Sequence, residues 1–120
     1  MTNILEKIIQ EKKETLVEIK KNNSLSSLED KIKNNSTFLD FKNTISNNKK
    51  ISLISEIKKA SPSAGILVKD FNHLDIAKLY VDNGATCLSV LTEENNFLGK
   101  LDYIKDIKDN FKIPVLAKDF

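Results

Sequence analysis

Apolar residues change their spacing near residue 51, and this change limits what the chain can fold into more than any other feature. Before it, apolar residues recur at helical spacing; after it, strand and helix patterns alternate. We expect strands over residues 51–58, 86–91 and 113–118, and helices over 72–83 and 100–110. The strands recur roughly every 30 residues, which suits helical crossovers between parallel strands. The pattern therefore predicts right-handed parallel β/α units.

The first part of the chain is expected to be helical. Asn3 followed by Glu6 has the spacing of a capping box, and Lys and Asn residues over 20–23 suit the end of the same helix. Two shorter helices are expected, one after Ser27 and one around 37–45.

A polar stretch over residues 46–50 reads as a boundary between two regions. We therefore expect a helical extension over residues 1–50 and an α/β region over 51–120.

Composition excludes several classes of protein. Basic and acidic residues number 19 and 17, a net charge of +2, so charge alone does not indicate nucleic-acid binding. All basic residues are Lys, so an anion has to be met by ammonium groups, hydroxyls or backbone N–H groups. One Cys and one His exclude an internal disulfide and the common zinc sites. No apolar run approaches a membrane span and no signal peptide is evident, so we expect a cytoplasmic setting.

Charged residues lie at the carboxyl ends of two of the expected strands. Glu56 and Lys58 lie two apart on a strand rich in apolar residues, so their side chains share a face. Lys118 ends the third strand, and the carboxyl ends of parallel strands are where α/β folds place their active sites. These three groups are predicted to converge on one cleft. The alternatives are a solvated Glu–Lys pair at a strand end and, for Lys118, a surface lysine.

Several segments in order resemble the indole-3-glycerol-phosphate synthase family. They are residues 53–63 (LISEIKKASPS), 75–80 (DIAKLY), 84–85 (GA), 88–93 (LSVLTE), 97–99 (FLG) and 113–120 (IPVLAKDF). The resemblance implies a partial (β/α)8 TIM barrel, comprising the first three strands and two helices, after an N-terminal helical extension. Such a barrel takes about 250 residues. We therefore expect this chain to be the first part of such an enzyme and to be inactive alone.

The resemblance also implies a reaction. The family closes the indole ring of 1-(2-carboxyphenylamino)-1-deoxyribulose 5-phosphate with loss of CO2 and water, without a cofactor or metal. Lys118 corresponds to the general acid that protonates the ribulose carbonyl oxygen. Lys58 corresponds to the lysine that engages the substrate carboxylate, and Glu56 to the carboxylate that orients and supports the two lysines.

Three further residues are implied at the substrate. Ser61 and Pro62 correspond to the loop that lines the pocket near the phosphate, and Phe97 to an aromatic that packs on the benzoate ring. For Phe97, an anchor of its own loop is a second interpretation. The expected partner is this phosphorylated small molecule, with no nucleic acid and no membrane.

A different class of function stays open. The chain could be a non-catalytic half-barrel module that associates with itself or complements a separate C-terminal half. Phosphoribosylanthranilate isomerase, another phosphate-binding barrel, is a weaker interpretation because the Cys/Asp acid–base pair that it needs has no place here. We expect Cys87 and Tyr80 to be core residues and His73 to be solvated.

Overall fold

The computed structural model describes residues 3–120, which form two compact units that divide between Phe38 and Leu39. The first unit contains helices α1 (Ile4–Asn22) and α2 (Leu25–Lys33). The expected capping box is confirmed, since the Asn3 side chain accepts the Glu6 N–H at 2.9 Å and the Glu6 carboxylate accepts the Asn3 N–H at 3.3 Å. Neither helix has a buried side chain within this unit.

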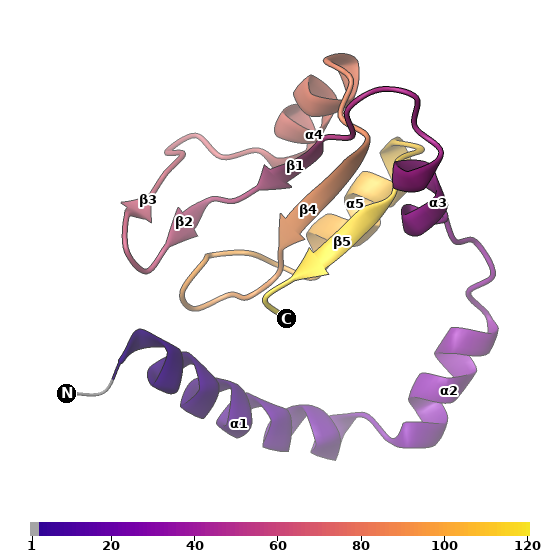
Figure 1. Ribbon diagram of the computed structural model, residues 1–120. Helices are drawn as coiled ribbons and strands as arrows, with labels where there is room; N and C mark the ends of the chain where they lie inside the picture. Colours follow the sequence, from indigo (N-terminus) through magenta and orange to yellow (C-terminus); the bar gives the residue numbers. More distant parts are fainter. Residues whose placement is uncertain (1–2) are drawn as a thin grey trace. The chain divides into compact units, whose positions relative to one another are not determined.

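The second unit is an α/β fold around a parallel three-stranded sheet, as the spacing predicted (Figure 1). Strands β1 (Ile54–Ile57), β4 (Cys87–Leu91) and β5 (Val115–Lys118) pair in the order β1-β4-β5. The central strand is buried along its whole length. All three strands run in the same direction, so their carboxyl ends meet at one edge.

Helices α4 (His73–Asp82) and α5 (Asp102–Asn110) cover one face of this sheet. The core between them and the sheet consists of Ile57, Ala77, Leu88, Val90, Ile107 and Ile113. Asn72 caps α4 as expected by accepting the N–H groups of Leu74 and Asp75. Gly84 follows the helix with φ +89°, a conformation that glycine adopts without strain. A short helix, α3 (Phe41–Ser46), contacts β4.

The expected boundaries differ from the observed ones where pairing or capping decides them. The first strand begins at Ile54 rather than at residue 51, because Ile51 is fully exposed and the register with β4 starts at Ile54. Helix α2 begins at Leu25 because Ser24, not a later serine, caps it. A small antiparallel hairpin of β2 (Ala60–Ser61) and β3 (Gly65–Ile66) follows β1 and was not expected.

The expectation of a solvated His73 is wrong. Its ring stacks on Tyr103 with centroids 4.2 Å apart, and Nε2 lies 2.8 Å from Asp106 Oδ2. His73 thus joins α4 to α5, which only the packing of the two helices could reveal. Cys87 is buried, as expected, and Tyr80 is half-buried against the core.

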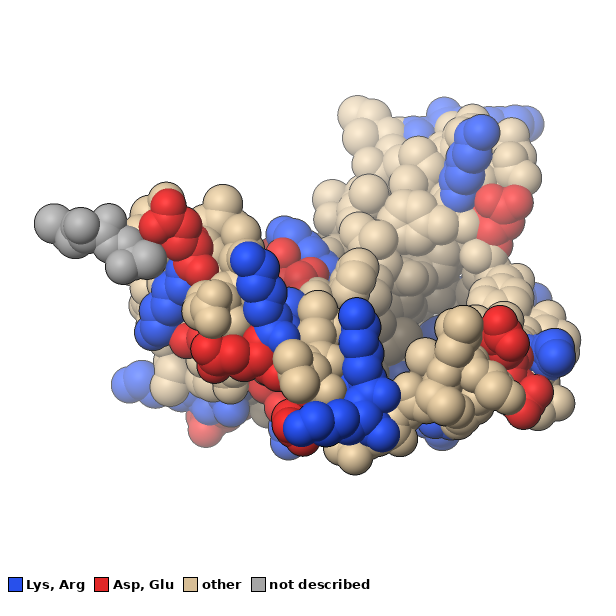
Figure 2. Space-filling model, turned by 90° about the horizontal axis from the view of Figure 1, so that it is seen from below, with Lys and Arg blue, Asp and Glu red and all other residues tan. Residues whose placement is uncertain are grey.

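No helix in the described part of the chain is long and apolar enough to cross a membrane. On the face that Figure 2 shows, Lys side chains are interspersed with Asp and Glu side chains among the described residues.

The assigned core predicts that two leucine substitutions lower the free energy of unfolding by very different amounts. Leu88→Ala should lower the free energy of unfolding by about 2–5 kcal/mol, because Leu88 is fully buried and its removal leaves a cavity. Leu79→Ala is the matched control: Leu79 is 60% exposed on α4, and its substitution should change stability by less than about 0.5 kcal/mol. Urea unfolding followed by circular dichroism measures both. Equal losses would contradict the assigned core.

Candidate active site

The strand register places three polar side chains on the sheet face opposite α4 and α5. Glu56 pairs with Ser89 across β1 and β4, and Leu91, two residues further along β4, pairs with Lys118 of β5. Side chains at alternate positions of paired strands point the same way, so Glu56, Ser89 and Lys118 face together. Glu56 and Lys118 lie at the carboxyl ends of β1 and β5, and Ser89 lies in the middle of β4.

The carboxylate of Glu56 joins the two predicted lysines. Lys118 Nζ donates to Glu56 Oε2 at 2.8 Å, and Lys58 Nζ lies 3.1 Å from Oε1. The Ser89 hydroxyl donates to Oε2 at 3.1 Å. The structure therefore brings Glu56, Lys58 and Lys118 together as predicted, and adds Ser89, which sequence patterns did not single out. We call these four residues the Glu56 cluster.

Hydrogen bonds in this cluster favour the ionised forms of Glu56 and Lys118. Burial opposes ionisation of Glu56, but hydrogen bonds from Lys118, Lys58 and Ser89 outweigh it, so the pKa of Glu56 lies below its ordinary value. The hydrogen bond to Glu56 raises the pKa of Lys118. One carboxylate between two ammonium groups leaves a net charge of +1 at neutral pH. Such a group can attract an anion and donate a proton from lysine.

The backbone of Lys118 is held by the end of the neighbouring strand. Its carbonyl accepts both the N–H of Thr92, at 3.0 Å, and the Thr92 hydroxyl, at 3.2 Å. The chain turns sharply after Lys118, where Asp119 has φ +54°. The Lys118 side chain thus projects from a strand end whose backbone is fixed to β4.

Ser61 and Pro62 lie in the hairpin that follows β1. The Ser61 hydroxyl accepts the Ala64 N–H at 3.2 Å and lies 3.5 Å from the Ser63 hydroxyl, so these contacts of Ser61 are made within the hairpin. Pro62 is exposed at the turn. The two residues therefore lie on a loop that comes shortly after Glu56 and Lys58 in the chain.

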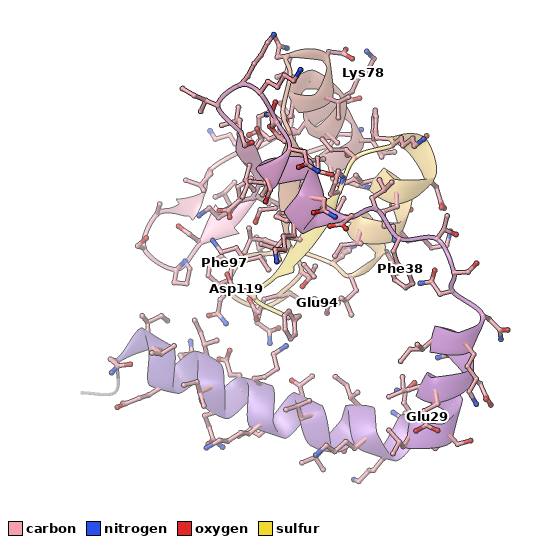
Figure 3. All side chains as sticks on the ribbon, turned by 45° about the vertical axis from the view of Figure 1, so that its right-hand side comes forward. Glu29, Phe38, Lys78, Glu94, Phe97 and Asp119 are labelled. Carbon is pink, nitrogen blue, oxygen red and sulfur yellow. The ribbon has the colours of Figure 1, made fainter. Side chains whose placement is uncertain are left out.

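Phe97 lies in the loop between β4 and α5, and is half-buried. Figure 3 shows Phe97 at the same end of the sheet as Asp119, the residue that follows Lys118 in the chain. The Phe97 backbone N–H donates to Glu93 at 3.0 Å. Glu93 is a second residue that sequence patterns missed, because the sequence of residues 92–96 (TEENN) does not indicate which of its two glutamates is buried.

Gly99 closes this loop against β4. A Cβ at this position would lie 2.1 Å from the carbonyl oxygen of Leu91, so only glycine allows the approach. Nearby, a separate pocket of about 270 Å³ is lined by Lys59, Glu94, Leu98, Gly99, Lys100 and Tyr103. The Glu56 cluster lines none of it.

The lowered pKa of Glu56 predicts a pH-dependent loss of stability. A depressed carboxyl pKa stabilises the fold above the unfolded value near 4.5, and this contribution disappears as pH falls through the lower folded value. We expect wild type to be more stable than Glu56→Gln at pH 7, with the difference shrinking below pH ~4.5. Urea unfolding at a series of pH values measures it. A difference independent of pH would contradict the ionised pairing.

Comparison with known proteins identifies the family of this chain. The family model described as indole-3-glycerol phosphate synthase matches residues 5–120. Curated relatives named indole-3-glycerol phosphate synthase come from Desulforamulus reducens (44% identity over 117 residues, 98% of this chain and 44% of the relative) and Aliarcobacter butzleri (45% over 120 residues, 98% and 46%). A third, from Legionella pneumophila strain Lens, is 44% identical over 120 residues, 100% of this chain and 46% of the relative.

The chain thus spans less than half the length of these relatives. The family model nevertheless matches the range 5–120, from the first helix through the last strand. The chain belongs to the indole-3-glycerol phosphate synthase family.

Proposed function

We propose that residues 51–120 supply the first three strands and two helices of a (β/α)8 barrel, after a helical extension over residues 1–50. The parallel order β1-β4-β5 with α4 and α5 on one face supports this proposal, because it is the repeating unit of such a barrel. Helix α3, which falls within residues 1–50, belongs to the same compact unit as the sheet and contacts β4. A biosynthetic role of this kind fits a cytoplasmic location.

The proposed activity is formation of indole-3-glycerol phosphate from 1-(2-carboxyphenylamino)-1-deoxyribulose 5-phosphate, with release of CO2 and water. One observation carries it: Glu56 lies 2.8 Å from the ammonium of Lys118 and 3.1 Å from that of Lys58, at the carboxyl ends of parallel strands. Family membership gives the reaction, and this geometry provides the charges that it needs.

Lys118 acts as the general acid in this proposal. Ring closure forms a bond from the aromatic ring to the ribulose carbonyl carbon, and the carbonyl oxygen gains negative charge as the bond forms. The ammonium of Lys118 donates its proton to that oxygen. Its raised pKa keeps the proton on the lysine at neutral pH until the oxygen becomes basic enough to take it.

The other residues of the site bind and orient the substrate. Lys58 attracts the substrate carboxylate, which leaves as CO2, and Glu56 holds both ammonium groups in place. Phe97 packs on the benzoate ring, and Ser61 and Pro62 border the phosphate end of the pocket.

A chimaera tests the role of Lys118. Residues 1–120 are joined to the remaining part of the Desulforamulus reducens relative, which this chain matches at 44% identity. In this chimaera, Lys118→Ala should lower kcat by about 100-fold or more while substrate still binds, because a general acid contributes roughly 10²–10⁴-fold. Lys112→Ala, an exposed lysine before the same strand, is the matched control and should leave the rate unchanged. Fluorescence of the indole product measures turnover.

Near-normal turnover in the Lys118→Ala chimaera would contradict the proposed role of Lys118. For residues 1–120 alone we expect no detectable product, because β1 and β5 are open sheet edges. Robust turnover by residues 1–120 would contradict this expected inactivity. Glu56→Ala should also lower the rate, through loss of the support for both lysines.

A second candidate function is a half-barrel module that associates with itself or with a C-terminal half. The observation that favours it is that an apolar residue is exposed on each of the two edge strands: Ile54 of β1 is 45% exposed and Leu116 of β5 is 46% exposed, both on the face opposite α4 and α5. Exposed apolar faces and open strand edges promote association.

Light scattering over a range of protein concentrations tests this association. We expect residues 1–120 to form dimers or larger species whose mass falls when Ile54→Lys and Leu116→Lys are introduced together. Leu79→Lys, on an exposed part of α4, is the control and should leave the mass unchanged. A monomer at every concentration would argue against the module.

A further inference from the structure

The loop between β4 and α5 is organised around one buried carboxylate. Glu93 is 5% exposed, yet it follows directly after a strand and precedes an exposed glutamate, Glu94. Burying a carboxylate is unfavourable unless hydrogen bonds compensate it. The buried carboxylate of Glu93 therefore needs hydrogen-bond donors around it.

Both carboxylate oxygens of Glu93 accept hydrogen bonds from the residues that follow. Oε1 accepts the Asn95 N–H at 3.0 Å and the Asn96 side-chain amide at 3.3 Å. Oε2 accepts the Asn96 N–H at 2.7 Å and the Phe97 N–H at 3.0 Å. Three successive backbone N–H groups thus converge on one side chain, which sets the path of the chain up to Phe97.

The start of this loop is also tied to the proposed general acid. Thr92 donates its N–H and its hydroxyl to the carbonyl oxygen of Lys118. The Glu93 carbonyl accepts the Gly99 N–H at 2.8 Å, which closes the loop on itself. Neighbouring residues Thr92 and Glu93 therefore link the backbone of Lys118 to the backbone of Phe97.

We propose that Glu93 is a positioning residue that holds Phe97 against the substrate at a set place relative to Lys118. This inference rests on the proposed function for the roles of Phe97 and Lys118. It assigns Glu93 no contact with the substrate: the carboxylate acts through the Phe97 backbone.

Glutamine is the sharpest substitution at this position. Gln has the size of Glu but only one acceptor oxygen, so its NH2 group would face one of the two pairs of donors. In Glu93→Gln, we expect amide hydrogen exchange at Asn95, Asn96 and Phe97 to accelerate about tenfold or more in residues 1–120, with β4 amides unchanged. Glu94→Gln is the matched control and should change none of these rates.

Unchanged exchange at all three amides in Glu93→Gln would overturn the inference. If Glu93→Gln also exposes the β4 amides, the fold itself has loosened and Glu93→Asp decides. Asp keeps both oxygens but has a shorter reach, so the loop amides should lose more protection than those of β4; equal loss in both would overturn the inference.

A double-mutant cycle in the chimaera separates positioning from general stability. Glu93→Gln should raise KM about tenfold with kcat changed less than about twofold, and this effect should vanish when Phe97→Ala is already present. A persistent effect in the Phe97→Ala background would overturn the inference. An inactive chimaera, or an active Lys118→Ala chimaera, would instead reject the proposed function. The hydrogen-exchange experiment on residues 1–120 does not depend on activity, so it would still test whether Glu93 holds the loop.

Discussion

Burial of one face of the β1-β4-β5 sheet against α4 and α5 is the constraint on which the rest of this molecule depends. Ile57, Leu88 and Val90 point toward the helices, so the alternate residues have to point away from them. Glu56, Ser89 and Lys118 are those alternate residues. A shift of one residue in either pairing would bury a charge beneath a helix, so the apolar core holds the polar cluster in register.

The Glu56 cluster combines two opposing effects. Partial burial works against ionisation of the carboxylate, whereas two ammonium groups and a hydroxyl stabilise its ionised form. The side chains of Glu56, Lys58 and Lys118 remain partly exposed, so a ligand can reach them. Because the chain contains no Arg, these contacts depend on lysine, which meets an anion as a single charge and can also give up a proton.

Two loops at the carboxyl ends of the strands differ in how they are held. The hairpin with Ser61 and Pro62 is held by its own hydrogen bonds. The loop with Phe97 is held by Glu93 and by the approach of Gly99 to the Leu91 carbonyl, so it is fastened to the sheet. Its geometry is thereby coupled to β4, the strand that neighbours Lys118, as the proposed roles of Phe97 and Lys118 require.

Much of the fold could be predicted because local patterns encode it. Asn3 with Glu6, and Asn72 with Gly84, mark helix ends by hydrogen bonds between near neighbours in the chain. The hairpin after β1 was missed because strands of two residues leave no periodicity to detect. His73 was misjudged because its partners, Tyr103 and Asp106, lie about 30 residues away on another helix.

The sequence by itself determined the α/β class, the order of strands and helices and the residues Glu56, Lys58 and Lys118, because apolar spacing and strand-end motifs are local properties. Only the tertiary structure decided that one carboxylate bridges both lysines, that Ser89 joins them, and that Glu93 rather than Glu94 turns inward. The physical reason is that these choices depend on strand register and on which donors a fold brings within hydrogen-bond distance, and residues far apart in the chain set both.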